Sequence, residues 1–599
     1  MQQMYLAIEH RAAMPWCYYD KSRKKIVLRL KCSSDVQAIK LLYGDPYRLN
    51  HSAAIHQWDF AEAELQKQFC GTSNCVWKIE LDVPHSKRLK YGFKLKTASG
   101  ELYLSENGAE PFNANAVNHS HFYFPFIHEV DALQTVDWVK DTIWYQIFPD
   151  RFCRKAGTEN EANVQQQDLE DWEAACNSKG KTHWRSFFGG NLKGIREKLP
   201  YLANLGINGI YLTPVFTSPS NHKYNIQDYF SIDPFFGNLN EMKALVNEAH
   251  SLNIRVMLDA VFNHAGSTHP FWLDVLEKQE ASVYRDYFHI HKFPIRQHDP
   301  GKSSHELDFH TFAWVPRMPK WNTENPQTRK YLLDSAAYWI KECDIDGWRL
   351  DVANEVSFDF WKEFSALVRS LKKDFYIVGE IWHDASVWIN QGFFDAVMNY
   401  PLQAAISNCF ISKKTDPKIF TEQLFAVLAR YSDFHNNMSF NLLDSHDTDR
   451  VISRASGDKQ ALRNAFTMMF LLPGSPCLYY GTEVGMEGEG DPDCRRPMIW
   501  NEKLQDLALH QFFQRLIEFR KKYLPLISNS VVSYNSEKNV HYWVFSSGGE
   551  SLIAVYSEKP VCNFAKPGLC VFEPEADSTL QKTGELPPET IFVFYKGNE

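Results

Sequence analysis

Two hydrophobic patterns alternate along the chain, and the changes between them divide it into regions. Residues 1–128 contain short segments in which apolar and polar positions alternate, such as Lys25–Lys31 and Trp77–Val83, separated by turn residues. This pattern predicts β-strands with one buried face. It returns in residues 523–599, for example at Val540–Phe545. We therefore expect a β-sandwich domain at each end of the sequence.

Between these regions, short apolar runs alternate with amphipathic helical patterns. Eight runs predict buried strands, at Ile143–Phe148, Gly209–Leu212, Arg255–Ala260, Gly347–Val352, Tyr376–Ile381, Ala396–Met398, Ser439–Leu443 and Cys477–Tyr480. Helical patterns separate several of them, at Leu192–Leu205, Leu239–Leu252, Pro326–Cys343, Phe358–Lys373 and Lys459–Leu472. Repeated strand–helix units of this number are typical of a closed parallel barrel, so we expect an α/β fold with a (β/α)8 TIM barrel.

The interval after the third predicted strand is too long for a simple loop. We expect residues 263–322 to form an inserted subdomain. The predicted organisation is then an N-terminal β-sandwich in residues 1–128, a barrel in residues 129–262 and 323–522, and a C-terminal β-sandwich in residues 523–599.

Charge and composition exclude several classes of protein. The 599 residues carry a formal net charge of -9, which argues against binding to a nucleic-acid backbone. The sequence lacks the long apolar run of a membrane span, and Met1–Asp20 lacks the apolar core of a signal peptide. The 12 cysteines are scattered, so we expect reduced thiols in a cytoplasmic protein. Cys70 and Cys75 are close in sequence, which is a weak indication of a disulfide.

Aromatic residues make up 14% of the chain. Two interpretations are open: a large core that contains many rings, or a cleft lined with rings. A lined cleft suits sugars, because flat apolar faces stack on sugar C–H groups while polar groups bind the hydroxyls.

Acidic residues stand at the ends of several predicted strands, where barrels of this kind carry their active sites. Arg349 and Asp351 are two positions apart, so their side chains share a face, and the arginine is expected to keep the carboxylate ionised as a nucleophile requires. Glu380 follows the next strand, and Asp447 ends a later one. Two opposed carboxylates are what glycoside hydrolysis needs, and a third can stabilise the positive charge of the transition state.

These segments resemble the α-amylase superfamily of glycoside hydrolases, family 13. The segments similar to its four main motifs are DAVFNH (259–264), GWRLDVANE (347–355), GEIW (379–382) and LLDSHD (442–447), and those similar to two further motifs are 206–216 and 474–485.

The resemblance implies a role for each catalytic position. Asp351 would be the nucleophile, Glu380 the general acid/base and Asp447 the stabiliser of the transition state. Other residues would bind the sugar at the cleavage point, namely Arg349, His264 and His446, with Tyr224 stacked on it.

A subgroup is also indicated. VANE at 352–355 and MPK at 318–320 resemble the neopullulanase, cyclomaltodextrinase and maltogenic amylase group. In that group the N-terminal domain, of the starch-binding-module type, packs against a second subunit, which implies a homodimer through residues 1–128. The resemblance implies further substrate-binding residues at Phe312, Glu355, Trp382, Asp491 and Arg495, with Trp314 as another wall residue.

Three positions depart from the group. Phe358 stands where the group has a histidine, which is expected to remove a hydrogen bond. Trp321 replaces a leucine, and Asp449 stands where a small residue or a glutamate is usual.

A further departure concerns calcium. Members that bind calcium carry clustered Asn and Asp after the first strand and an Asp after Phe-Gly-Gly. Here the first segment, 153–158, contains Arg154 and Lys155, and the later position is Asn191. Because a hard divalent ion requires six or more oxygen ligands, we expect no calcium site and no other metal or cofactor.

The sequence thus favours a retaining α-glycosidase that hydrolyses α-1,4 bonds in cyclomaltodextrins and short maltooligosaccharides, acts more slowly on pullulan and starch, and transglycosylates. One alternative is an α-glucosidase or oligo-1,6-glucosidase, which usually lacks the N-terminal domain. The others are a glucan-binding protein that has lost catalysis and a starch-surface binding module.

Overall fold

The computed structural model describes residues 7–50, 57–155, 169–173, 186–296, 305–575, 580 and 584–597. The chain forms two compact units, which we describe separately. Unit 1 comprises Met1–Thr135, Lys413–Asn436 and Pro525–Glu599, and unit 2 comprises Val136–Ser412 and Asn437–Leu524.

Unit 2 contains the predicted parallel barrel. Its strands run in the order β20–β19–β18–β17–β14–β13–β22–β21, and a parallel bridge between Met398 and Phe440 joins the two ends of this order. The eight strands are β13 Trp144–Ile147, β14 Gly209–Leu212, β17 Arg255–Ala260, β18 Gly347–Leu350, β19 Tyr376–Gly379, β20 Ala396–Val397, β21 Phe440–Asn441 and β22 Ser475–Tyr479. Each lies within or overlaps the run predicted for it, because strands buried on both faces read as continuous apolar segments.

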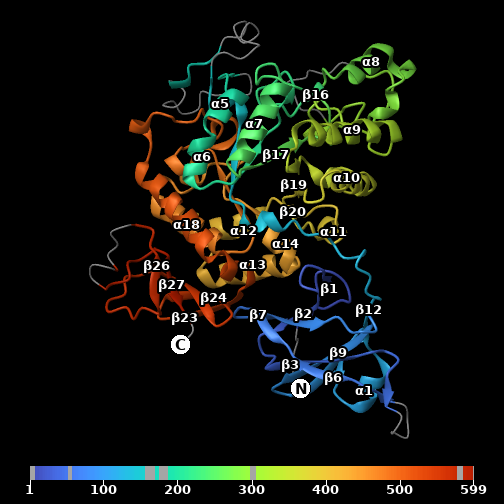
Figure 1. The fold of residues 1–599 in the computed structure, drawn as a ribbon, viewed down its shortest axis with the longest axis vertical. Helices are drawn as coiled ribbons and strands as arrows, with labels where there is room; N and C mark the ends of the chain where they lie inside the picture. The colour runs from blue at the N-terminus through green and yellow to red at the C-terminus, as the bar shows by residue number, and fades with distance from the viewer. Residues whose placement is uncertain are drawn as a thin grey trace. The chain divides into compact units, whose positions relative to one another are not determined.

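Helices follow the strands and surround them, as α7, α9 and α10 do in Figure 1. Their bounds are α2 Pro149–Phe152, α5 Leu192–Glu197, α6 Leu199–Leu205, α7 Leu239–Ser251, α9 Pro326–Cys343, α10 Phe358–Leu371, α11 Ser386–Ile389, α12 Tyr400–Ile406, α15 Val451–Arg454, α16 Lys459–Leu471, α17 Gly490–Asp493 and α18 Leu507–Asn529. Side-chain caps set several starts. Asn238 and Glu241 form a capping box on α7, and Ser357 caps α10.

One helix prediction is wrong. The expected helix over Leu192–Leu205 is divided into α5 and α6 at Lys198. Pro200 lies in the first turn of α6, where its missing N–H costs little, but it could not donate within a continuous helix.

The segment after β17 is an insertion in the barrel, as predicted. It contains α8 Pro270–Lys278 and the 3-10 turns η2 Gln279–Ala281, η3 Arg285–Tyr287 and η4 Phe312–Trp314. Its small core includes Trp272, Phe288 and Trp321, all buried. A hairpin of β15 Phe216–Thr217 and β16 Asp228–Ile232 follows β14 and carries Tyr224 in its connecting loop.

Among its described residues, unit 1 contains the short strand pair β4–β5 and two larger sheets. One is antiparallel, in the order β11–β10–β9–β3–β6, with β12 on β9. The other joins residues from both ends of the sequence, in the order β1–β2–β8–β7–β23–β24–β25–β27–β26, and β7 pairs with β23 in parallel. Strands are β1 Cys17–Asp20, β2 Lys25–Ser33, β3 Ala38–Gly44, β4 Leu49–Asn50, β5 Gln57–Trp58, β6 Ala61–Glu64, β7 Gln66–Cys70, β8 Asn74–Asp82, β9 Leu89–Thr97, β10 Gly100–Ser105, β11 Gly108–Pro111, β12 Phe122–Phe124, β23 Val531–Glu537, β24 Val540–Ser547, β25 Glu550–Ser557, β26 Leu569–Phe572 and β27 Phe592–Lys596.

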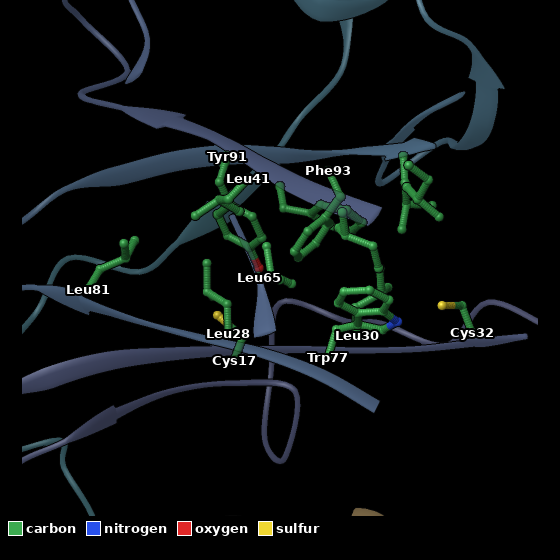
Figure 2. Close-up of a cluster of buried hydrophobic side chains, with 14 of the residues drawn as sticks. Cys17, Leu28, Leu30, Cys32, Leu41, Leu65, Trp77, Leu81, Tyr91 and Phe93 are labelled. Carbon is green, nitrogen blue, oxygen red and sulfur yellow. The ribbon is translucent and has the colours of Figure 1, made fainter. Parts of the chain in front are cut away.

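The N-terminal sheets enclose a shared apolar core (Figure 2). Leu28, Leu30 and Trp77 from one sheet meet Leu41 and Phe93 from the other, and all are buried. This is the sandwich that the alternating pattern of residues 1–128 predicts.

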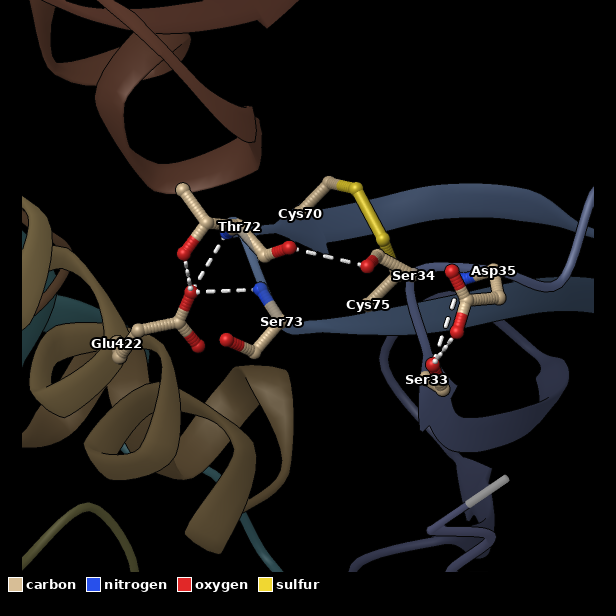
Figure 3. Close-up of a disulfide and its surroundings, with 8 residues drawn as sticks. All are labelled: Ser33, Ser34, Asp35, Cys70, Thr72, Ser73, Cys75 and Glu422. Carbon is tan, nitrogen blue, oxygen red and sulfur yellow. Dashed lines mark hydrogen bonds between the residues drawn. A yellow bond between two sulfur atoms is a disulfide. The ribbon is translucent and has the colours of Figure 1, made fainter. Parts of the chain in front are cut away.

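A disulfide corrects the expectation of reduced thiols throughout. Cys70 and Cys75 are bonded, with the sulfurs 2.12 Å apart. They stand opposite each other in the β7–β8 hairpin, whose register brings the two residues together. The loop between them surrounds the carboxylate of Glu422 (Figure 3): Oε1 accepts from Thr72 N at 2.6 Å, Thr72 Oγ1 at 2.8 Å and Ser73 N at 3.0 Å.

Glu422 belongs to α13 Pro417–Arg430, which is part of unit 1 although it comes from the middle of the sequence. α14 Asp433–Met438 follows α13, and α1 Ala114–His119 lies in the N-terminal part of unit 1. The buried Arg29 of β2 donates to the main-chain oxygens of Tyr431 and Leu428, at 2.6 Å and 3.4 Å. Among the described helices, none is long and apolar enough to cross a membrane.

Candidate active site

A cavity of about 490 Å³ opens in unit 2 where the predicted catalytic residues meet. Its lining comes from segments that directly follow barrel strands, from the β15–β16 hairpin, from the insertion after β17 and from the segment around α17. The lining residues are His222, Tyr224, His264, Phe312, Val315, Arg317, Met318, Asp351, Val352, Asn354, Glu355, Glu380, Trp382, Asp447, Asp491 and Arg495. Of the predicted residues, Arg349 and His446 are buried and do not line the cavity, Trp314 lies outside the lining, and the others are part of it.

The main-chain hydrogen bonds between neighbouring barrel strands continue past the strand ends and include Asp351 and Glu380. Asp351 N donates to Ala260 O at 3.0 Å, and Glu380 N donates to Leu350 O at 2.9 Å. The carboxylates are therefore held on rigid strand ends rather than on free loops.

Arg349 stands at the centre of the carboxylates. Its Nη1 lies 2.9 Å from Asp351 Oδ1 and 3.0 Å from Asp259 Oδ2, and its Nη2 lies 2.9 Å from Glu380 Oε2. One guanidinium thus holds three buried acids, and it places the two reacting carboxylates on neighbouring nitrogens.

The electrostatic surroundings of Asp351 are less favourable to its ionised form than expected. The sequence predicts that the neighbouring Arg349 keeps this acid ionised. Burial, and then the charge of Glu380, raise the pKa of Asp351 well above its usual range, although Arg349 opposes them. Burial likewise raises the pKa of Asp259 to about 6. One cation does not balance three buried acids, so these surroundings disfavour full ionisation of Asp351 and Asp259.

The Oδ2 atom of Asp351 is free. It is buried, and no hydrogen-bond partner reaches it from the described residues. The side chain lines the cavity. Because Arg349 holds the other oxygen, Oδ2 keeps its lone pairs available for attack on a bound sugar.

Glu380 has two further donors. Val352 N lies 3.0 Å from its Oε2, and Trp382 Nε1 lies 3.2 Å from its Oε1. Val352 has a positive φ of 45°, which is strained for a β-branched residue. This strain is compensated by the N–H that it directs at Glu380.

Tyr224 lines the cavity, and the buried His446 stacks against it. Their rings stack with centroids 5.4 Å apart and planes 6° apart. Tyr224 Oη lies 2.9 Å from Asp259 Oδ2, so the tyrosine is fixed by the same acid that holds Arg349. Burial, with the charges of Arg495 and Arg349, lowers the pKa of His446 well below its usual range.

Arg495 connects Asp447 to Asp491. Its Nη2 lies 3.1 Å from Asp447 Oδ1 and its Nη1 lies 2.9 Å from Asp491 Oδ1, while its Nε donates to His446 O at 2.7 Å. Four predicted residues, Asp447, Asp491, Arg495 and His446, are therefore joined by ion pairs and hydrogen bonds through Arg495.

The opposite wall is formed by the insertion. His264 stacks on Phe312 at 5.2 Å, and its Nε2 lies 3.2 Å from Tyr224 O. Burial lowers the pKa of His264 to about 3, so it is a neutral hydrogen-bonding group. Trp314 is half exposed beside His305 and is not among the residues that line the cavity.

Glu355 and Trp382 stand at the cavity mouth. Lys320 Nζ lies 3.2 Å from Glu355 Oε2 and 3.0 Å from its main-chain oxygen. Trp382 is 48% exposed and stacks on Tyr400 with centroids 3.7 Å apart. The exposed ring is a platform on which a sugar can stack.

Sequence reasoning missed several lining residues: His222, Val315, Arg317, Met318, Val352 and Asn354. It also missed Gln146, whose Nε2 lies 2.7 Å from His446 Nδ1. A usable signal existed for Gln146, since it is a polar residue inside an otherwise apolar strand. The loop residues carry no periodic pattern that marks them.

The three departures have structural explanations. Trp321 stacks on Phe288 at 4.5 Å and donates to Tyr229 Oη at 3.0 Å, so it fills the insertion's core. Phe358 is half exposed at the start of α10, where it packs on Trp388. Asp449 accepts a hydrogen bond from Gly490 N and so anchors the loop before Asp491.

The geometry defines a class of enzyme. A carboxyl oxygen without a hydrogen-bond partner on Asp351, a second carboxyl group beside it on Glu380, and a third, Asp447, beside aromatic rings are the groups of a glycoside hydrolase. Comparisons with known proteins agree. Residues 146–522 match the family described as "Alpha amylase, catalytic domain", and residues 1–128 match "Alpha amylase, N-terminal ig-like domain".

The similarity to known proteins extends over nearly the whole chain. It is 42% identical over 559 residues to a cyclomaltodextrinase of Geobacillus thermopakistaniensis, covering 92% of this chain and 90% of the relative. It is 40% identical to an intracellular maltogenic amylase of Bacillus subtilis, with coverage of 92% and 90%. A solved cyclomaltodextrinase structure aligns with a TM-score of 0.84 and 34% identity, over 99% of this chain and 98% of that one. The protein belongs to the alpha-amylase family of glycoside hydrolases.

Proposed function

We propose that this protein is a retaining α-glycosidase that hydrolyses the α-1,4 bonds of cyclomaltodextrins and short maltooligosaccharides, with slower action on pullulan and starch. The observation that carries the proposal is the arrangement of Asp351 and Glu380 on one guanidinium, with Asp351 Oδ2 free. The names of the similar cyclomaltodextrinase and maltogenic amylase support the substrate class.

The first step forms a glycosyl-enzyme. Asp351 Oδ2 attacks the anomeric carbon as the glycosidic C–O bond breaks, and Glu380 gives its proton to the leaving oxygen. Asp447 lines the cavity, where it can stabilise the positive charge on the sugar ring, and Tyr224, stacked on the buried His446, lines it as well.

The second step releases the sugar. Glu380, now ionised, takes a proton from water as the water oxygen attacks the anomeric carbon, and the bond to Asp351 breaks. When a sugar hydroxyl replaces water, the product is a transglycosylated oligosaccharide. The half-exposed ring of Trp382 offers that acceptor a place to stack.

The decisive test uses Asp351→Asn and Glu380→Gln on β-cyclodextrin. Each variant is expected to keep at most a few per cent of wild-type activity. Retention of substantial activity by either one would contradict the assigned roles. Product analysis with β-cyclodextrin, pullulan and starch separates the alternatives, because an oligo-1,6-glucosidase would spare the cyclic substrate.

The assembly and the location are part of the proposal. The N-terminal domain match supports a homodimer through residues 1–128 that narrows the cleft, and the similar intracellular maltogenic amylase supports a cytoplasmic location. A particle mass near twice 69.5 kDa in solution is expected. A monomer at micromolar concentration would remove this account of selectivity.

We also propose that the calcium site of related enzymes is absent. Part of the segment 153–158 lies outside the described residues. In the described part, Lys155 is paired with Glu197 at 2.7 Å. Asn191 uses its oxygen to cap α5 at Gly194 N and its amide to donate to Lys155 O. These groups are committed to the protein, so a chelator is expected to leave the Tm unchanged; a fall of several degrees would contradict this.

A further inference from the structure

Gln146 is a buried amide in the middle of an apolar strand. All four residues of β13, from Trp144 to Ile147, are buried, and Gln146 is 1% exposed. A buried amide is costly unless it is hydrogen-bonded. Its Nε2 lies 2.7 Å from Nδ1 of His446.

The second nitrogen of His446 faces two acceptors. Nε2 lies 2.5 Å from Tyr224 Oη and 3.1 Å from Asp447 Oδ2. Tyr224 gives its own proton to Asp259, so its oxygen accepts. A ring nitrogen between two acceptors must carry the proton. In a neutral imidazole Nδ1 is then bare, and it accepts from the Gln146 amide.

We propose that Gln146 is a positioning residue that holds His446 as a neutral imidazole with its proton on Nε2. The inference rests on the proposed glycosidase function, since its consequence is catalytic. Positive charge develops on the sugar ring in the transition state. An imidazolium directly behind Tyr224 would oppose that charge, and the other neutral tautomer would turn a lone pair toward Asp447.

The charged groups around His446 act in opposite directions on its protonation. Arg495 and Arg349 oppose protonation of His446, whereas Glu380 favours it. Asp447 also favours it, through its contact with Nε2. Gln146 is the uncharged partner at Nδ1, so a change of its charge should decide the protonation state of the ring.

Two substitutions test this. Gln146→Met keeps the shape but removes the donor, and kcat on β-cyclodextrin is expected to fall at least tenfold with the Tm within a few degrees of wild type. Gln146→Glu places an acceptor at Nδ1, which stabilises the imidazolium. Because activity then requires loss of that proton, the acidic limb of the kcat/KM profile is expected to move to higher pH by at least one unit.

Gln403→Met is the matched control, because that amide also donates within unit 2, to Leu443 O at 3.2 Å, but lies outside the cavity lining. Its kcat and pH profile should match those of wild type. Wild-type-like kcat in Gln146→Met, or an unshifted profile in Gln146→Glu, would overturn the proposal. If Gln146→Glu does not fold, Gln146→Met decides alone. A wild-type enzyme inactive on all maltooligosaccharides would instead refute the proposed function.

Discussion

Nη1 of Arg349 lies 2.9 Å from Oδ1 of Asp351, and this contact leaves the other carboxylate oxygen as the reacting atom. The same guanidinium holds Asp259 and Glu380. The arginine therefore fixes the orientation of the nucleophile and offsets the charge of the acid cluster.

Arg349→Lys separates these two roles. A lysine keeps the charge but cannot bridge two carboxylates with a rigid fork. We expect activity on β-cyclodextrin to fall by at least a hundredfold, while the protein remains folded. Arg349→Met, which leaves three acids buried without a cation, should in addition lower the free energy of unfolding by about 3–5 kcal/mol. Equal Tm values for the two variants would contradict the charge argument.

Trp382 combines a ring and a donor, and two substitutions distinguish them. Trp382→Phe keeps an aromatic face but loses the Nε1–H that reaches Glu380 Oε1. Loss of one such bond corresponds to about 1 kcal/mol, so kcat should fall about fivefold with little change in KM. Trp382→Ala also loses the platform, so KM should rise. Steady-state kinetics on maltotriose measure both, and identical kinetics for the two variants would refute the division.

Asp346 gives a pH-dependent prediction for stability. It pairs with Arg255 and Lys372, at 3.0 Å each, and with His250. Although burial opposes them, the hydrogen bond with His250, the charge of Lys372 and the hydrogen bond from Val256 N lower the pKa of Asp346 to about 2. A carboxyl whose folded-state pKa is lowered stabilises the protein above the unfolded value, and loses this effect as pH falls toward 2.

Asp346→Asn is therefore expected to reduce the free energy of unfolding by about 2 kcal/mol at pH 7. The difference from wild type should shrink between pH 4 and pH 2. Urea unfolding at several pH values measures it. A difference that stays constant over this range would show that the substitution acts through packing rather than through charge.

Gly71 allows the disulfide loop to approach Glu422. A Cβ at this position would lie within 2.4 Å of Glu422 Oε1, so Gly71→Ala must displace the carboxylate that accepts from Thr72 and Ser73. We expect a loss of about 1 kcal/mol in stability, measured by thermal unfolding. In a Glu422→Ala background the same substitution should cost almost nothing. An additive double variant would contradict the steric explanation.

Pattern in the sequence predicted the regular parts of the fold well. Strands such as β14 and β17 were found because a strand buried on both faces has a continuous apolar run. The helix over Leu192–Leu205 was predicted as one because its apolar spacing continues through Lys198, while Pro200 interrupts the hydrogen bonding.

The site was predictable where residues follow strands and not where they come from loops. Asp351 and Glu380 could be predicted because each directly follows a barrel strand. His222 and Arg317 reach the cavity from separate loops, and their approach depends on tertiary packing. The raised pKa of Asp351 could not be predicted for a related reason, because the sequence does not show that one arginine serves three acids.

The pairing of β7 with β23 has a consequence for the order of folding. Val532 stands opposite Phe69, so β7 is synthesised long before its partner strand β23. Until the later strand emerges from the ribosome, the edge of β7 stays open to other chains. Removal of the C-terminal strands should therefore give an aggregating product rather than a smaller enzyme, and production in cells should depend on chaperones that protect that edge.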